Sequence, residues 1–504
     1  MKNFNNYLLK FRLFLLVSLP FALVFSYHPR ISLSSTSSMN LELSIPLLWL
    51  LLFALSSLPR LPYSLRSLLL NSHPKFRPFL LILFCFSFFY PAASIFWSPN
   101  PLRAILTFGV FACLLISSLT ISELISSQKI KTNLCKSTLI SGVFAAFFCL
   151  VQCILDIFQV PPTTTLLCQG CSYQTFGFPH PNGFAIEPQF MGNLLIAPTF
   201  LALALSFDFK LRQKLFQTNS RSIFFTVSAF LLFAIFLTFS RGAIYSSLAA
   251  LFILFVFLLI KHLKTHQKIT HLLLIFPLLT FSVLASLLTQ GLFAQISPTN
   301  DTFLSGVTKS VHQLSLGKID FRPPLKPKLQ PQPKSQSLPA SKPFPSPATP
   351  AQKSGKHSSL QTGYIAESTN IRLKLSRYGL DLWKSSPQNL IFGVGLGGAG
   401  QSLYQKYPSL GSPKEIIQNE YITVLAELGL IGFIILSAFS ILIFFFAFRY
   451  ANPFFLATLF AFFLSVNFFS GFPNALHIYL LSPALYYVLA SSQKPTRSNL
   501  CEKN

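Results

Sequence analysis

Long apolar segments recur along almost the whole chain and are separated by short polar turns. Each runs for about 17–25 residues with little charge, the length that an α-helix needs to cross a hydrocarbon core of about 30 Å. The pattern therefore predicts an all-α, polytopic membrane protein with about twelve transmembrane helices. These helices are predicted near residues 8–27, 41–58, 78–96, 104–122, 138–158, 184–206, 222–240, 243–261, 271–291, 422–448, 453–470 and 475–491.

The composition agrees with this prediction. Of the 504 residues, 52% are hydrophobic and only 10% are charged, whereas a soluble domain carries about a quarter charged residues. A single water-soluble globule is therefore excluded. The net charge of +26 would suggest nucleic-acid binding in a soluble chain, but here the basic residues lie in short loops between apolar spans. We therefore expect the lipid bilayer, and no nucleic acid, as a partner.

Basic residues are concentrated in alternate loops. They follow the second, fourth, sixth and eighth predicted helices, whereas the intervening short loops hold only Arg30, Arg103 and Arg241. Because positively charged loops stay in the cytoplasm, both termini are predicted to be cytoplasmic, in agreement with an even number of helices. Nothing like a small-residue cleavage site follows the first apolar segment, so we expect it to be retained as a helix.

One long segment, residues 292–421, interrupts the run of helices and is predicted to be extracytoplasmic. Its part 323–356 is rich in proline and has few large apolar side chains, so we expect it to be disordered. Its part 365–421 regains a regular pattern and is predicted to be ordered and to hold site residues. The rest of the chain is predicted to form helices 1–9 (residues 1–291), helices 10–12 (422–491) and a cytoplasmic tail (492–504).

Two cysteines, Cys168 and Cys171, form a C-x-x-C pair in an outward loop. A metal site would need two more ligands, and only His180 is near in the sequence. We therefore predict a disulfide or two unpaired thiols here, and no metal site.

Two charged residues lie near the predicted outer boundary of the membrane. Glu187 falls about one turn inside it, where a carboxylate is costly unless it is paired or protonated. It is either functional or hydrogen-bonded to a neighbouring helix. Arg241 lies in a tight turn between two helices, where it is either a snorkelling helix-end residue or a fixed guanidinium suited to phosphate oxygens.

The segment IRLKLSRYGLDLWK, residues 371–384, has the spacing of a helix. Arg377 can form an ion pair there with Asp381 one turn later. A glycine run follows at 393–400, but no βαβ unit flanks it, which excludes a nucleotide site. Its backbone N–H groups can still bind an anion. One apolar stripe of the helix is predicted to hold Ile371, Leu375, Tyr378 and Leu382.

The last polar stretch, Gln418-Asn419-Glu420-Tyr421, leads into the tenth predicted helix. Glu420 and Glu427 are two turns apart and therefore share one face of this helix. Gly429 and Gly432 are predicted to let a neighbouring helix approach closely.

Together these features resemble the O-antigen ligase and O-antigen polymerase superfamily of bacterial envelope glycosyltransferases. The order and sidedness of the motifs make the set specific, and the motifs cover most of residues 170–435. They are the long outward loop, Ser240-Arg241-Gly242, Ser376-Arg377…Trp383…Gly393-Val-Gly395, Asn419…Ala426-Glu427-Leu-Gly429-Leu-Ile-Gly432, and the polymerase-like HPN and EP stretch at 180–188.

The resemblance implies a multi-pass enzyme of the bacterial inner membrane that works without metal or other cofactor. It implies transfer of a glycan from undecaprenyl diphosphate to a hydroxyl of a lipid- or glycan-bound acceptor, at the outer face. Arg241 and Arg377 match the family's diphosphate-binding arginines, and Asn419, His180 and Asn182 would orient the acceptor.

One position departs from the family pattern. The family places a histidine before Asn419 as base or orienter of the acceptor, whereas this chain has Gln418, and an amide cannot take up the proton. Three interpretations follow. Glu420 or Glu187 serves as the base, with a pKa raised near the membrane. Alternatively, Gln418 only aligns the acceptor while the leaving group is stabilised, or transferase activity has been lost.

The competing function class is a non-catalytic transporter or flippase. Such proteins are typically built from internal repeats with polar sites at the membrane midplane. Here no repeat is evident, and the polar residues gather at the outer boundary.

Overall fold

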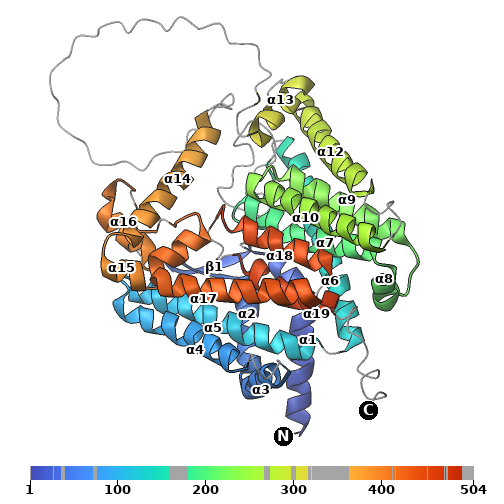
Figure 1. Cartoon of the computed structure of the whole chain (residues 1–504). Helices are drawn as coiled ribbons and strands as arrows, with labels where there is room; N and C mark the ends of the chain where they lie inside the picture. The colour runs from blue at the N-terminus through green and yellow to red at the C-terminus, as the bar shows by residue number, and fades with distance from the viewer. Residues whose placement is uncertain are drawn as a thin grey trace, which may run out of the picture.

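The structure is a computed structural model of the chain and is predominantly helical (Figure 1). The proline-rich part 323–356, Cys168 and Cys171, for which the sequence made predictions, lie outside the residues that it describes. Those residues are 2–26, 28–35, 40–71, 77–125, 127–157, 180–265, 273–296, 302–315, 319, 363–410, 412–414, 416–450, 452–469, 472 and 475–490.

Within these ranges, nine helices are long and apolar enough to cross a membrane. One of them continues from α2 through the short 3₁₀ turn η1 (Leu58–Arg60), and another extends from α4 to the end of the 3₁₀ turn η3 (Ile95–Trp97). The helices are α1 (Lys2–Val24), α2 (Ile45–Ser57) with α3 (Leu61–Asn71), α4 (Arg77–Ser94), α5 (Pro101–Leu124), α6 (Gln128–Ile157), α7 (Pro188–Phe207), α10 (Arg241–Thr265), α12 (Ile275–Ile296) and α17 (Glu420–Tyr450).

Three further predicted spans correspond to shorter helices. The pair α8 (Phe209–Phe216) and α9 (Arg221–Leu237) is bent by 97°, and it passes as a span only when taken together. The helices α18 (Pro453–Ser465) and α19 (Leu476–Ala490) are apolar but short. Every predicted span thus coincides with a helix, and the prediction of an all-α polytopic membrane protein is confirmed.

Several helices begin where polar and proline residues meet. Asn100 precedes Pro101, and its side chain accepts a hydrogen bond from the backbone N–H of Arg103 over 3.2 Å. Asn452 precedes Pro453 in the same way. The side-chain oxygen satisfies a backbone N–H of the first turn, and proline has none to satisfy.

Helix α7 forms the centre of the bundle. Nearly all of its residues are buried, including Met191, Leu195 and Phe200, which are almost inaccessible to solvent. It packs against α6, α9, α10 and α18. A helix that is apolar on every side is stable only when other helices surround it, so α7 fixes the positions of the elements around it.

Some elements were not expected from the sequence. The strands β1 (Arg30–Ser35) and β2 (Asn40–Ser44) form an antiparallel hairpin between α1 and α2. The short helix α13 (Phe303–Leu314) folds back on α12, where Gly306 lies against Gly291.

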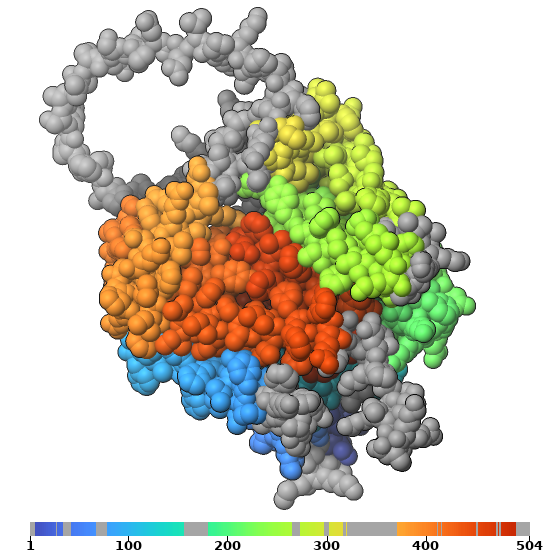
Figure 2. Space-filling model, in the orientation of Figure 1, coloured from blue at the N-terminus to red at the C-terminus, as the bar shows by residue number. Residues whose placement is uncertain are grey.

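A compact segment precedes α17 and packs at one end of it (Figure 1). It consists of α14 (Gly363–Trp383), α15 (Pro387–Phe392), α16 (Ala399–Lys406) and the turn η5 (Pro408–Leu410). Figure 2 shows its orange surface bordering the red surface of α17 and α18. The small core that it shares with α17 contains Leu382, Val394, Leu403, Ile417 and Ala426.

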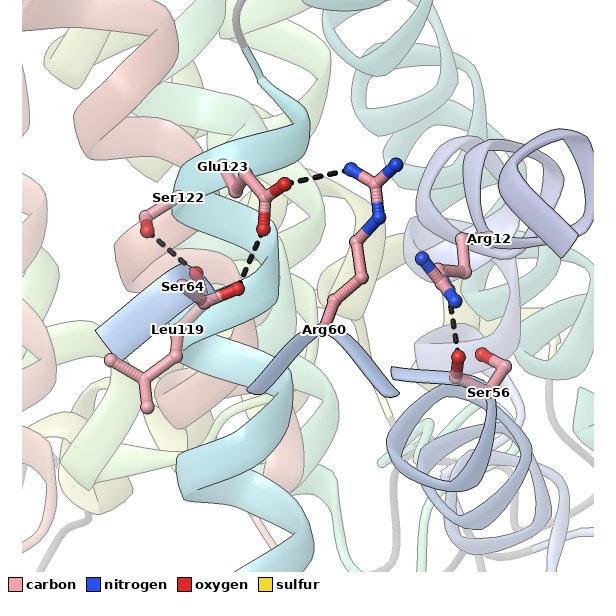
Figure 3. Close-up of polar contacts among 7 residues, drawn as sticks. All are labelled: Arg12, Ser56, Arg60, Ser64, Leu119, Ser122 and Glu123. Carbon is pink, nitrogen blue, oxygen red and sulfur yellow. Dashed lines mark hydrogen bonds and ion pairs between the residues drawn. The ribbon is translucent and has the colours of Figure 1, made fainter. Parts of the chain in front are cut away.

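A polar cluster ties the helices at the opposite end of α5 (Figure 3). Glu123 accepts hydrogen bonds from Arg60 Nη1 at 2.8 Å and from Ser64 Oγ at 2.6 Å. Beside it, the buried Arg12 donates through Nε to the carbonyl of Ser56 at 2.7 Å. Because the Arg60–Glu123 pair is partly exposed, we assign it only about 0–1 kcal/mol. The cluster joins α1, α2, α3 and α5.

Candidate functional site

Helix α17 is interrupted at Gly429, and the glycine run crosses it there. Gly429 has a φ of +61°, and a Cβ on it would lie 2.4 Å from the carbonyl oxygen of Ile391. Gly393 has a φ of +73° and meets the carbonyl of Glu427 just as closely. Only glycine fits such positions without strain. A neighbouring helix does approach closely at Gly429, as expected, because Ile391 lies in the last turn of α15. A Cβ on Gly432 would instead meet Leu428 of its own helix.

Hydrogen bonds hold this crossing in place. The N–H groups of Val394 and Gly395 donate to the carbonyls of Ala426 and Glu427 at 2.9 and 2.8 Å. The Glu427 carboxylate accepts from the N–H of Gly397 at 2.8 Å. Several N–H groups of the glycine run thus donate to α17 and not to an anion, and these bonds anchor the segment α14–α16 to α17.

The buried face of α14 differs from the predicted stripe. Leu375, Gly379 and Leu382 face inward, whereas Ile371 is exposed. A Cβ on Gly379 would lie 2.8 Å from Ile417 and from Ile422, so the helix approaches α17 closely here. Counting back three residues from Leu375 along this face reaches Arg372, which is therefore directed into the protein.

Arg372 reaches the beginning of α7. Its Nη1 donates to Gln189 Oε1 at 3.0 Å and to the carbonyl of Phe468 at 2.8 Å. Its Nη2 lies 3.8 Å from Glu187 Oε2. Glu187 is the N-cap residue of α7, but its side chain makes no capping hydrogen bond, so the carboxylate faces Arg372 instead.

The beginnings of α7 and α10 meet beside Arg372. A Cβ on Gly192 would lie 2.6 Å from the Ala243 side chain. A Cβ on Gly242 would lie 2.6 Å from Gln189 Nε2 and 3.0 Å from the Phe468 side chain. Gln189 and Phe468 are both partners of Arg372. Arg241, the first residue of α10, therefore directly precedes a glycine that packs against both partners of Arg372.

His180 lies near Arg241. Burial lowers the pKa of its imidazole to about 4, the backbone of Phe239 opposes this shift, and the nearby Arg241 adds to it. The ring is therefore neutral at pH 7. The loop that carries it is fixed by Gln152, which accepts from the N–H of Gly183 at 2.7 Å. Asn182 donates to the carbonyl of Ala185 at 2.9 Å, so it shapes this loop.

The Gln418–Glu420 stretch lies where α17 begins. Asn419 accepts from the N–H of Ile422 at 3.1 Å and donates to the carbonyl of Asn467 at 3.1 Å. Glu420 is buried, and its carboxylate accepts from the N–H of Phe472 at 3.1 Å and interacts with Tyr479. Asn419 and Glu420 thus join α17 to the α18–α19 connection, while Gln418 is half-buried in the bend before them.

Arg377 is not among the residues brought together. It lies exposed on α14, and its expected partner Asp381 instead pairs with Lys406 Nζ at 2.8 Å. Hydrogen bonds from Lys406 and Tyr407 lower the pKa of the Asp381 carboxyl. These contacts tie α14 to α16, away from the beginning of α7.

The described residues therefore assemble a site rich in cationic and donor groups. Arg372 supplies a guanidinium group beside Gln189, Arg241 begins the adjacent helix α10, and the amino-terminal ends of α7 and α10 add partial positive charge. Such an arrangement favours an anion with several oxygens. Among the residues described here, no group of three or more His, Cys, Asp or Glu is placed to hold a metal ion.

Residues 226–437 match a family model described as O-antigen ligase. This match supports the O-antigen ligase and O-antigen polymerase superfamily. The matched segment includes Arg241, Arg372 and Gln418, whereas Gln189 and Phe468 lie outside it. No curated protein matches the chain. The O-antigen ligase match, together with the many apolar helices, supports a ligase- or polymerase-type function in glycan assembly by a multi-pass membrane protein.

Proposed function

We propose that this protein transfers a glycan from undecaprenyl diphosphate to an acceptor hydroxyl at the outer face of the bacterial inner membrane, in surface polysaccharide assembly. The observation that carries the proposal is the placement of Arg372 beside Gln189 at the amino-terminal end of α10, where Arg241 begins the helix. Two guanidinium groups can there neutralise the two phosphates of a departing lipid diphosphate.

The reaction exchanges one bond for another. The acceptor oxygen attacks the anomeric carbon of the donor sugar, and the bond between that carbon and the phosphate oxygen breaks. The electron pair of the broken bond stays on the lipid diphosphate, next to Arg241 and Arg372. The proton of the acceptor hydroxyl goes to a base of the protein.

Glu187 suits the role of this base better than Glu420. Its side chain is 45% exposed and only 3.8 Å from Arg372, so its oxygens can face an acceptor beside the diphosphate. Glu420 is engaged by Phe472 and Tyr479. His180 is neutral and near Arg241, which suits an acceptor-orienting hydrogen bond together with Asn182 and Asn419.

Arg372 takes the place in this proposal that the family resemblance assigned to Arg377. Both residues lie on α14, but the contacts of Arg372 with Gln189 and Phe468 are at the junction of α7 and α10. We propose Gln418 as an aligning group for the acceptor, because its amide can donate and accept hydrogen bonds but cannot take up the proton.

A reconstitution experiment tests the proposal. Purified protein in liposomes receives an undecaprenyl-diphosphate-linked repeat unit, and products are followed as a ladder of glycan lengths or as glycan on an added acceptor. We expect product with the natural protein and a loss of at least about 10²-fold with Arg241→Ala or Arg372→Ala. Movement of the lipid across the bilayer without any glycan transfer would instead support a flippase.

A further inference from the structure

Gln189 has a buried side-chain amide that is only partly hydrogen-bonded. It lies in the first turn of α7 and is only 5% exposed. Its Oε1 accepts the hydrogen bond from Arg372 Nη1 at 3.0 Å. Its Nε2 is buried and has no hydrogen-bond partner among the described residues.

The orientation of this amide is fixed by its neighbour. A guanidinium group has only donors, so the amide atom that faces Arg372 must be the carbonyl oxygen. Rotating the amide by half a turn would place two donors against each other. The two N–H bonds of Nε2 therefore point away from Arg372, toward Gly242, whose Cβ position is 2.6 Å from this nitrogen.

The side of the amide that holds Nε2 is already rich in donors. Arg241 comes directly before Gly242, and the first N–H groups of a helix have no partner inside that helix. A buried N–H group without a partner destabilises a protein. An oxygen-rich anion placed there would satisfy Nε2 and be held by Arg241 and Arg372 at the same time.

We infer that Gln189 is a substrate-contacting residue whose Nε2 donates a hydrogen bond to a non-bridging oxygen of a lipid diphosphate. This inference rests on the proposed function. Gln189 also positions Arg372, because its Oε1 holds the guanidinium group. A glutamate in its place would still bind Arg372, but it would present a negative oxygen where the diphosphate needs a donor.

The test measures binding of geranylgeranyl diphosphate to the full-length protein in detergent, through the rise in apparent melting temperature. Geranylgeraniol, which has no phosphate, is the comparison ligand. We expect Gln189→Glu to raise the half-saturating concentration of the diphosphate at least about tenfold, which corresponds to about 1.4 kcal/mol. Gln290→Glu is the matched control, since it also places a carboxylate at a fully buried glutamine, on α12, and should bind as the natural protein does.

A second variant covers the case in which Gln189→Glu does not fold. Gln189→Met keeps the length of the side chain but removes both amide atoms, so binding should again weaken at least about tenfold. Unchanged binding in a folded Gln189 variant, with binding lost in Arg372→Ala, would overturn the inference and leave the proposed function standing. A natural protein that responds equally to geranylgeraniol and to the diphosphate would overturn the diphosphate site itself.

Discussion

Arg372 and Gln189 are 183 residues apart in the chain, and the guanidinium Nη1 of the first donates to the amide Oε1 of the second at 3.0 Å. This contact joins α14, from the long segment between two spans, to the central helix α7. Because α14 is anchored to α17, the contact also helps to fix the position of the interrupted helix α17 relative to α7.

The two arginines of α14 allow a direct comparison. We expect Arg372→Ala to lower glycan transfer at least about 10²-fold, because the protein loses a positive charge that stabilises the departing diphosphate. Arg377→Ala removes the same side chain from an exposed position five residues later and should retain most activity at equal protein level. In vitro transfer with both purified variants is the measurement, and the reverse ranking would restore Arg377 as the diphosphate ligand.

The two candidate bases should differ in what their removal changes. Glu187→Gln should lower the transfer rate by about 10²–10⁴-fold with little change in stability, because the side chain is half-exposed. Glu420→Gln should mainly lower stability, by about 1–3 kcal/mol, because it weakens a buried acceptor of two hydrogen bonds. Rates and thermal unfolding are measured on the same samples. A stable Glu420→Gln protein with no activity would contradict this assignment.

The interruption of α17 at Gly429 predicts that adding one methyl group there strongly lowers the stability of the protein. Gly429→Ala should destabilise the protein by at least about 2 kcal/mol, because the residue has a positive φ and its Cβ would overlap the Ile391 carbonyl. Gly109→Ala on α5 is the control, since a Cβ there meets nothing within 4 Å, and it should be neutral or stabilise the helix by up to about 1 kcal/mol. Equal melting temperatures of the two variants would contradict the strained geometry.

The buried His180 predicts a loss of stability in acid. Its pKa falls from 6.5 to about 4 in the folded protein, so between these values the unfolded chain binds a proton that the folded chain excludes. The free energy of unfolding must then decrease as the pH falls through this window, and His180 adds no pH dependence above it.

The contribution reaches roughly 2 kcal/mol at pH 5, at about 1.4 kcal/mol for each pKa unit. His180→Asn should therefore lose less apparent melting temperature between pH 7.5 and pH 5 than the natural protein. Parallel pH curves for the two proteins would show that the imidazole is not buried in its neutral form.

The positions of the membrane helices could be predicted from the sequence because hydrophobic length is a local property. The hairpin of β1 and β2 was missed although Ile31 and Leu33, and then Leu41 and Leu43, alternate with polar residues. The alternation is short, and residues 41–44 continue directly into the apolar run of the second predicted helix. The break at Gly429 was also missed, because its cause is the approach of Gly393, which lies 36 residues earlier in the sequence.

The position of Arg372 could have been predicted from the residue spacing of α14. Arg372, Leu375, Gly379 and Leu382 repeat at intervals of three and four residues, so a cation occupies the buried stripe of α14. The predicted stripe began one residue earlier, at Ile371, and left Arg372 unnoticed. Gln189 gave no such signal, because a glutamine in an apolar helix becomes informative only when its neighbours are known.

The hydrogen bond from Arg372 to the carbonyl of Phe468 limits how the chain can be truncated. The family segment ends at residue 437, yet its arginine is held by groups from both flanks, Gln189 before it and Phe468 after it. An excised version spanning 226–437 would keep both guanidinium groups but lose the surfaces against which one of them is oriented. Minimised or chimeric versions should therefore exchange the α7 and α18 ends together with that segment.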